Sequence, residues 1–297
     1  MSLSSTTRVL FLCIIAVTAP LAKAQIAALP DPKVQTTVPP DVKPKVWEYG
    51  EYRVVPVRVH LLRDTVTPAA GTTLTEADIA RIFKKANGIW HVAGVHLRVE
   101  SIVSEKPASL GDNEHKAEMP TDGLLALRPE DSRPQGMFHV YYIGAMSPNG
   151  IFMRRDGIFV KEAARLKKVP GGIDEPLPRV SAHELGHGMG LPHRQDTTNL
   201  MASGTTGTSV NEAEIAIVRQ RLSQYKWVDT PETCLKSADE MLTAGKREEA
   251  LTRYQALLDL PVDRDAKAAL QLKVKTASSR TLSGEGHVKE SKPDAKP

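Results

Sequence analysis

The sequence has 297 residues, of which 41% are hydrophobic and 25% charged, a composition typical of soluble globular proteins. A formal net charge of +4 and an aromatic content of only 5% argue against a nucleic-acid partner, because such proteins carry a basic stripe with interleaved aromatic side chains. The length is sufficient for one sizeable domain and a second, small one.

The first 24 residues have the features of a secretory signal peptide. Arg8 is followed by an apolar run over residues 9–19, and Ala22, Lys23 and Ala24 match an A-x-A cleavage site. The apolar run is short for a membrane span, although an uncleaved membrane anchor is the alternative. We therefore predict a secreted protein, extracellular or periplasmic, without stable membrane insertion after cleavage of residues 1–24.

Cleavage would leave Cys234 as the single cysteine, because Cys13 lies within the signal. An intrachain disulfide is then excluded even in an oxidising compartment. Cys234 lies on an apolar helical face, which favours a buried small side chain over a reactive thiol.

After the signal, extended and helical patterns alternate. Residues 25–50 are rich in proline and are expected to be extended. Alternating apolar and polar residues over 55–62 predict a half-buried strand. Thr75 and Asp78 then resemble a helix N-cap with its acidic third position. The helix carries an apolar stripe that we expect to face the core, made of Ile79, Ile82, Phe83, Ala86 and Trp90.

Further strands and a long excursion follow this helix. Gly94 ends the predicted helix, and residues 95–102 form the next predicted strand. Residues 103–136 are rich in proline, glycine and acidic side chains and predict a long loop, and loops of this length are usually functional or disordered. A strand is predicted over 137–144, and 150–160 fits two short strands joined by a tight turn.

An uninterrupted H-E-x-x-H-x-x-G-x-x-H pattern begins at His183. On a helix His183 and His187 share one face, so both imidazoles can reach one cation. Gly190 can adopt the left-handed conformation that ends a helix and brings His193 to the same ion. Glu184 lies about 100° around the helix from His183, near enough to reach a water on the ion without ligating it. Three protein ligands and one open position are typical of catalytic zinc, so hydrolysis is the leading hypothesis.

Met201 follows the third histidine by eight residues and completes a pattern that resembles the metzincin superfamily of zinc endopeptidases, in which a methionine turn lies beneath the metal. The spacing is similar to that of the matrixin branch. The resemblance implies that His183, His187 and His193 ligate zinc, that Glu184 is the catalytic acid/base, and that Met201 is the apolar floor. Plain core packing would explain Met201 equally well.

The resemblance also implies a fold for residues 51–226. This fold is α+β, with a twisted, mixed and mostly parallel sheet and the zinc-binding helix beneath it. The edge strand lines the cleft in this family, so Gly150, Ile151, Phe152 and Met153 are the candidate substrate-binding residues. The alternative is an edge strand that only completes the sheet.

Two departures leave the subfamily open. Arg194 follows the third histidine, where matrixins usually have serine. Ser203 stands where astacin-like and serralysin-like enzymes have a tyrosine that can approach the zinc, so no tyrosine switch is expected.

The remaining chain predicts helices and a tail. Residues 205–209 are small and flexible, and the resemblance implies that they help to wall the pocket for the residue after the scissile bond. Asn211 begins a helix. Residues 231–277 predict helical hairpins that resemble a tetratricopeptide repeat, with little more than one repeat, so docking on the catalytic domain is favoured over a peptide-binding array. Protein contact through these helices is the other interpretation. Residues 278–297 predict a disordered tail.

The sequence therefore predicts a secreted zinc endopeptidase with one catalytic Zn²⁺, protein or peptide substrates, and Glu184 as general acid/base. Calcium is suggested by family resemblance, without a ligand set to support it. Two alternatives stay open: a catalytically silent binding or scaffold protein on the same fold, and a zinc hydrolase of a non-peptide substrate.

Overall fold

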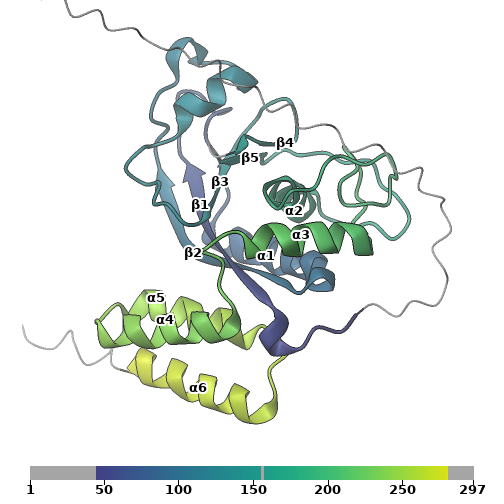
Figure 1. Ribbon diagram of the computed structural model, residues 1–297. Coiled ribbons are helices and arrows are strands. Elements are labelled where there is room, and N and C mark those ends of the chain that lie inside the picture. The colour runs from purple at the N-terminus through teal and green to yellow at the C-terminus, as the bar shows by residue number, and fades with distance from the viewer. Residues whose placement is uncertain (1–44, 155–156, 280–297) are drawn as a thin grey trace, which may run out of the picture. The chain divides into compact units, whose positions relative to one another are not determined.

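A five-stranded β-sheet forms the centre of the computed structural model, which describes residues 45–154 and 157–279 (Figure 1). The strand order is β2-β1-β3-β5-β4, and every neighbouring pair is parallel except β4 with β5. The strands are β1 (Arg53–Leu62), β2 (Val95–Glu105), β3 (Phe138–Ile143), β4 (Gly150–Phe152) and β5 (Ile158–Lys161). The predicted α+β class and mostly parallel sheet are therefore confirmed.

One face of the sheet shares a core with three helices, which lie together on one side of it in Figure 1. They are α1 (Glu76–Trp90), α2 (Pro176–Gly188) and α3 (Glu212–Ser223). Thr75 and Asp78 form the predicted capping box at the start of α1, and Gly94, with φ of 62°, ends the short 3-10 turn that follows the helix. All five residues of the predicted apolar stripe are buried, so the expected core face of this helix is confirmed.

The opposite face of the sheet is covered by the chain that we predicted as a long loop. β2 continues to Glu105, and the rest of residues 103–136 contains two 3-10 turns. Leu124 and Leu127 from this excursion are buried in a core with Tyr141. Because both faces are covered, β1 is buried along almost its whole length, and the prediction of a half-buried strand was wrong.

The C-terminal part contains three helices, one more than a single hairpin. They are α4 (Pro231–Thr243), α5 (Arg247–Leu258) and α6 (Arg264–Ser279). Residues 278 and 279 are therefore helical and do not belong to a tail. The apolar stripe of α6 is weak, since Leu270 and Ala277 are its buried residues, which explains why the sequence pattern did not define its end.

These helices share a second core with the beginning of the described chain. Cys234, Ala238 and Tyr254 pack in it together with Trp47 and Tyr52. Cys234 is a buried free thiol, as expected. Trp47 is also buried, so the end of the proline-rich segment is held in this second core.

Three predicted segments lie wholly or partly outside the described residues. They are the signal peptide at 1–24, most of the segment at 25–50, and the tail from residue 280 onward. Within the described residues, no helix has the length and apolar character needed to cross a membrane.

Candidate metal centre

Helix α2 carries the first two histidines of the motif on one face. It begins with a proline and is buried along almost its whole length. The Nε2 atoms of His183 and His187, one turn apart, lie 3.2 Å from each other. Gly190, with φ of 98°, turns the chain after the helix, and the Nε2 atom of His193 lies 3.1 Å from that of His187. The structure thus brings the three predicted ligands together.

Hydrogen bonds define which nitrogen of each helical histidine faces the cluster. Nδ1 of His183 donates to the carbonyl of Leu200 (2.8 Å), and Nδ1 of His187 donates to that of Leu191 (2.7 Å). A carbonyl only accepts, so the proton of each neutral ring is on Nδ1 and the lone pair is on Nε2. Burial lowers the pKa of His183 to about 3 and also lowers that of His187. Both imidazole rings are therefore neutral near pH 7, and their Nε2 lone pairs are available to a metal ion.

The three nitrogens suit a small divalent cation. With metal–nitrogen distances of about 2.0–2.1 Å, two ligands at the tetrahedral angle would be separated by roughly 3.3 Å, close to the spacings found here. Among the described residues, the histidines at 183, 187 and 193 form the one group of three or more His, Cys, Asp or Glu side chains that could hold a metal ion. Imidazole donors define a transition-metal site and are a poor set for calcium.

Glu184 lies beside this group but does not belong to it. Its Oε1 atom is 4.0 Å from Nε2 of His183, and the residue is only 5% exposed. Burial raises the pKa of Glu184 to about 8, while the Arg179 guanidinium and the backbone amide of Phe152 act in the opposite direction. This position suits a group that exchanges protons next to the metal site.

The edge strand β4 lies against the same carboxylate. A Cβ added to Gly150 would be 2.7 Å from Oε1 of Glu184 and 2.6 Å from a side-chain methyl group of α2, so a larger residue needs movement. In the described sheet β4 pairs only with β5, which leaves its outer edge unpaired. Gly150, Ile151 and Phe152 form the strand, and Met153 follows it. Contact of these four residues with a substrate stays a prediction.

Met201 packs directly under α2. A Cβ added to Gly186 would lie 2.8 Å from its sulfur, so this glycine permits the close approach. Met201 is fully buried in the main core, and its amide donates to Oδ1 of Asn199 (2.7 Å). This placement agrees with an apolar floor beneath the histidines, and it is core packing at the same time.

Arg179 is part of this centre, and the sequence analysis missed it. It lies one turn before His183, is 2% exposed, and donates to the carbonyls of Leu200 (2.6 Å), Gly207 (3.2 Å) and Ala202. The carbonyl of Leu200 therefore accepts from both Arg179 and His183. Burial lowers the pKa of Arg179 to about 10, so the side chain is still charged at pH 7. Its four-residue spacing from His183 predicts a common face of the helix, but not the carbonyl partners that give Arg179 its role.

A second buried network holds the loop of the third histidine. Nε of Arg194 donates to Oε1 of Glu214 (2.8 Å), a fully buried carboxylate in the first turn of α3. The other oxygen accepts from Nδ2 of Asn199 and from the amide of Asn211, both at 2.9 Å. The amide of Arg194 donates to the carbonyl of Met201 (2.9 Å). Arg194, the departure from the matrixin pattern, thus links this loop to the methionine turn and to α3.

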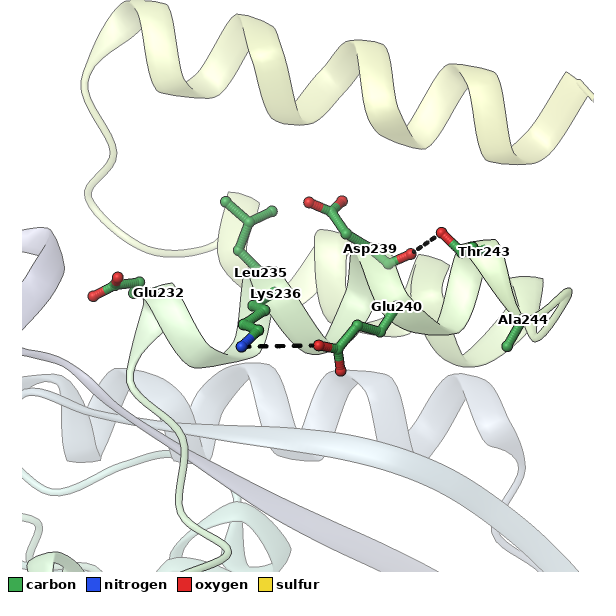
Figure 2. Close-up of a pocket in the computed structure, with 7 residues that line it drawn as sticks. All are labelled: Glu232, Leu235, Lys236, Asp239, Glu240, Thr243 and Ala244. Carbon is green, nitrogen blue, oxygen red and sulfur yellow. Dashed lines mark hydrogen bonds and ion pairs between the residues drawn. The ribbon is translucent and has the colours of Figure 1, made fainter.

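A separate groove of roughly 630 Å³ is lined by residues of α4 and by Ala244, which follows the helix (Figure 2). Lys236 pairs with Glu240 across 4.0 Å. Asp239 accepts from Nζ of Lys273 and from the hydroxyl of Tyr254, each at 2.6 Å. Most charges of the groove are therefore satisfied within the C-terminal helices, and protein contact through them stays a prediction.

Comparisons with known proteins add little to this description. No family model and no curated protein match the chain. A solved structure described as that of a chaperone-substrate complex is similar over 59% of this chain and 35% of that chain, with 11% sequence identity and a TM-score of 0.36. The chain thus spans about a third of that protein's length, and a likeness at this level carries no argument about function.

Proposed function

We propose that this chain is a secreted zinc-dependent endopeptidase of metzincin-like, and more closely matrixin-like, architecture. The observation that supports it best is the convergence of three imidazole nitrogens, from His183, His187 and His193, beside the buried carboxylate of Glu184. The sequence resemblance and the mostly parallel sheet with its antiparallel edge strand are consistent with this assignment.

The histidine residues would hold the ion with their Nε2 atoms, because hydrogen bonds to Leu200 and Leu191 engage Nδ1 of the two helical rings. A bound Zn²⁺ would supply a Lewis acid for the scissile carbonyl and would lower the pKa of water toward neutrality. The loop networks around Arg179 and Arg194 keep the methionine turn and the third histidine in place.

Glu184 performs the proton transfers. Its carboxylate accepts a proton from the attacking water and passes it to the leaving amine. This requires the ionised form, which positive charge in the site favours against the effect of burial. Ser181, the serine nearest the motif, is buried and exchanges a hydrogen bond with the hydroxyl of Tyr142 (2.7 Å), so it is not poised as a nucleophile.

The outer edge of β4 supports a peptide substrate. Extended peptides bind to unpaired strand edges through backbone hydrogen bonds, largely independent of their sequence. Gly150 brings the backbone of this edge to the carboxylate of Glu184, so a strand added here would run past the catalytic group. Gly150, Ile151, Phe152 and Met153 are therefore the proposed substrate contacts.

The decisive experiment compares wild type with Glu184→Ala, using Glu212→Ala on the exposed first turn of α3 as control. We expect wild type and both variants to bind one zinc per chain by elemental analysis. Wild type and the control should cleave an unfolded protein in a chelator-sensitive manner, while Glu184→Ala loses at least about 100-fold in turnover.

Three outcomes would change the assignment. Unchanged turnover in Glu184→Ala would refute the mechanism, and a zinc-free wild type would refute the metal site. Zinc binding without any cleavage of protein would favour a silent binding protein, or a hydrolase of non-peptide substrates if small esters or amides are hydrolysed.

A further inference from the structure

The segment between β5 and α2 carries three exposed cationic side chains close together in the sequence. Arg165, Lys167 and Lys168 are exposed, and none of the described carboxylates pairs with them. We call these three residues the basic rim. Ala164 and Leu166 pack against the main core, so the chain alternates and directs the charged side chains of Arg165 and Lys167 outward.

The acidic side chains of the same segment are occupied elsewhere. Glu162 accepts hydrogen bonds from the hydroxyl of Thr72 (2.6 Å) and the amide of Thr73 (2.7 Å). Asp174 pairs with Nζ of Lys85 across 2.9 Å, and the neighbouring glutamate pairs with the same lysine across 3.0 Å. Among the described residues, no carboxylate of this segment forms an ion pair with the basic rim.

Backbone hydrogen bonds place the basic rim next to the candidate site. The side chain of Asn149 donates to the carbonyl of Arg165 (2.8 Å) and accepts from its amide (3.2 Å). Asn149 directly precedes Gly150, whose position on the edge strand is in contact with Glu184. Arg165 therefore lies at the beginning of the edge strand.

Lys167 is tied to the chain on the other side of the site. Its amide donates to the carbonyl of Gly204 (2.8 Å), and its carbonyl accepts from the amide of Thr206 (3.0 Å). The hydroxyl of Thr206 also accepts from the amide of Val169 (3.0 Å). These residues follow the methionine turn, in the segment that the sequence resemblance assigns to the pocket wall. The basic rim thus connects the edge strand with that wall.

We infer that the basic rim selects peptides with acidic side chains next to the scissile bond. This inference rests on the proposed endopeptidase function and adds a substrate class to it. An extended peptide on β4 would bring its side chains within reach of the rim, where exposed ion pairs form. Three such cations should favour aspartate or glutamate over glutamine by about fivefold to tenfold in kcat/KM, and lysine should be disfavoured.

The test uses three matched peptides with the same cleavable core, flanked by glutamate, glutamine or lysine. Wild type is compared with the rim variant Arg165→Gln, Lys167→Gln, Lys168→Gln. The control variant is Arg264→Gln, Lys267→Gln, Lys275→Gln, which removes one arginine and two lysines from exposed positions of α6. Urea unfolding of all three proteins verifies that the substitutions leave the fold intact.

Wild type and the α6 control should prefer the acidic peptide at 50 mM salt and lose most of that preference at 0.5 M salt, where charges are screened within about 4–5 Å. The rim variant should cleave the glutamine peptide normally and show less than about a twofold preference. A preference that survives in the rim variant, or its absence from a wild type that cleaves the glutamine peptide, overturns the inference.

Binding of the same peptides to Glu184→Ala, measured by fluorescence anisotropy, separates this inference from the proposed function. Wild type could cleave none of the peptides, while the acidic peptide binds more tightly than the glutamine peptide and the rim substitutions abolish that difference in affinity. This result would support the selectivity of the basic rim and refute the protease assignment. If binding does not depend on peptide charge, the rim has no selective role.

Discussion

Replacing Arg179 with leucine tests whether the buried guanidinium holds the methionine turn to the metal-binding helix. The substitution removes the donors to the carbonyls of Leu200, Gly207 and Ala202, which lie in a buried region. Each buried acceptor left without a donor costs about 1–3 kcal/mol. Part of this cost is offset because the substitution also removes a cation whose burial is itself unfavourable. We therefore expect the free energy of unfolding to fall by about 2–4 kcal/mol.

The assay is urea unfolding of metal-free protein, so that metal binding does not contribute to the difference. Arg179→Lys should recover only part of the lost stability, because a single ammonium group cannot reach all the carbonyls that the planar guanidinium contacts. Arg221→Leu, at an exposed position near the end of α3, should change stability by less than about 0.5 kcal/mol. A loss for Arg179→Leu no larger than that of this control would refute the reasoning.

Two further predictions concern the edge strand and the pH dependence of stability. Gly150→Ala should keep zinc binding but lower turnover and cost about 1–3 kcal/mol of stability, because the added Cβ would collide with Glu184 and α2. The control Gly88→Ala, in open space on α1, should be neutral or stabilising. Turnover, zinc content and urea unfolding are measured for both variants, and full turnover in Gly150→Ala would contradict the prediction. Burial, reinforced by the positive charge of Arg98, lowers the pKa of His96 from 6.5 to about 4. Between these two pH values His96 is protonated in the unfolded chain but neutral in the folded chain. The stability present above pH 6.5 is therefore lost as the pH falls toward 4. Between pH 7.5 and 5, His96→Gln should therefore lose about 2 kcal/mol less than wild type in urea unfolding, and parallel pH profiles of the two proteins would contradict the assignment.

Local patterns predicted the parts of the site that depend on helix geometry. The spacing of His183 and His187 fixes their common face, and Gly190 supplies the positive φ that turns the chain toward His193. The capping residues at Thr75 also follow from a four-residue pattern. Each of these features depends on residues within about one helical turn of each other.

Features that depend on distant contacts were not predictable. Arg179 bonds to carbonyls more than 20 residues later in the chain, and a carbonyl leaves no trace in the sequence. Arg194 pairs with Glu214, 20 residues away, and only the structure brings the two together. The burial of β1 likewise depends on the excursion that covers its second face. In each case the outcome depends on tertiary packing that the local pattern does not contain.

The two edge strands of the sheet, β2 and β4, have different neighbours, and this difference bears on the proposed function. At one edge, the C-terminal part of the chain packs against the middle of β2: Arg253 of α5 pairs with Glu100 across 3.0 Å, and Arg98 donates to Asp229 at 2.8 Å and lies 3.0 Å from the Cys234 sulfur. At the other edge, no strand of the described residues lies on the outer side of β4, which adjoins Glu184. Exposed edges recruit other strands without selection, so these contacts disfavour strand addition at the middle of β2. Under the proposed function, the C-terminal helices would therefore direct an extended substrate to the one edge where a carboxylate and three imidazoles are in place.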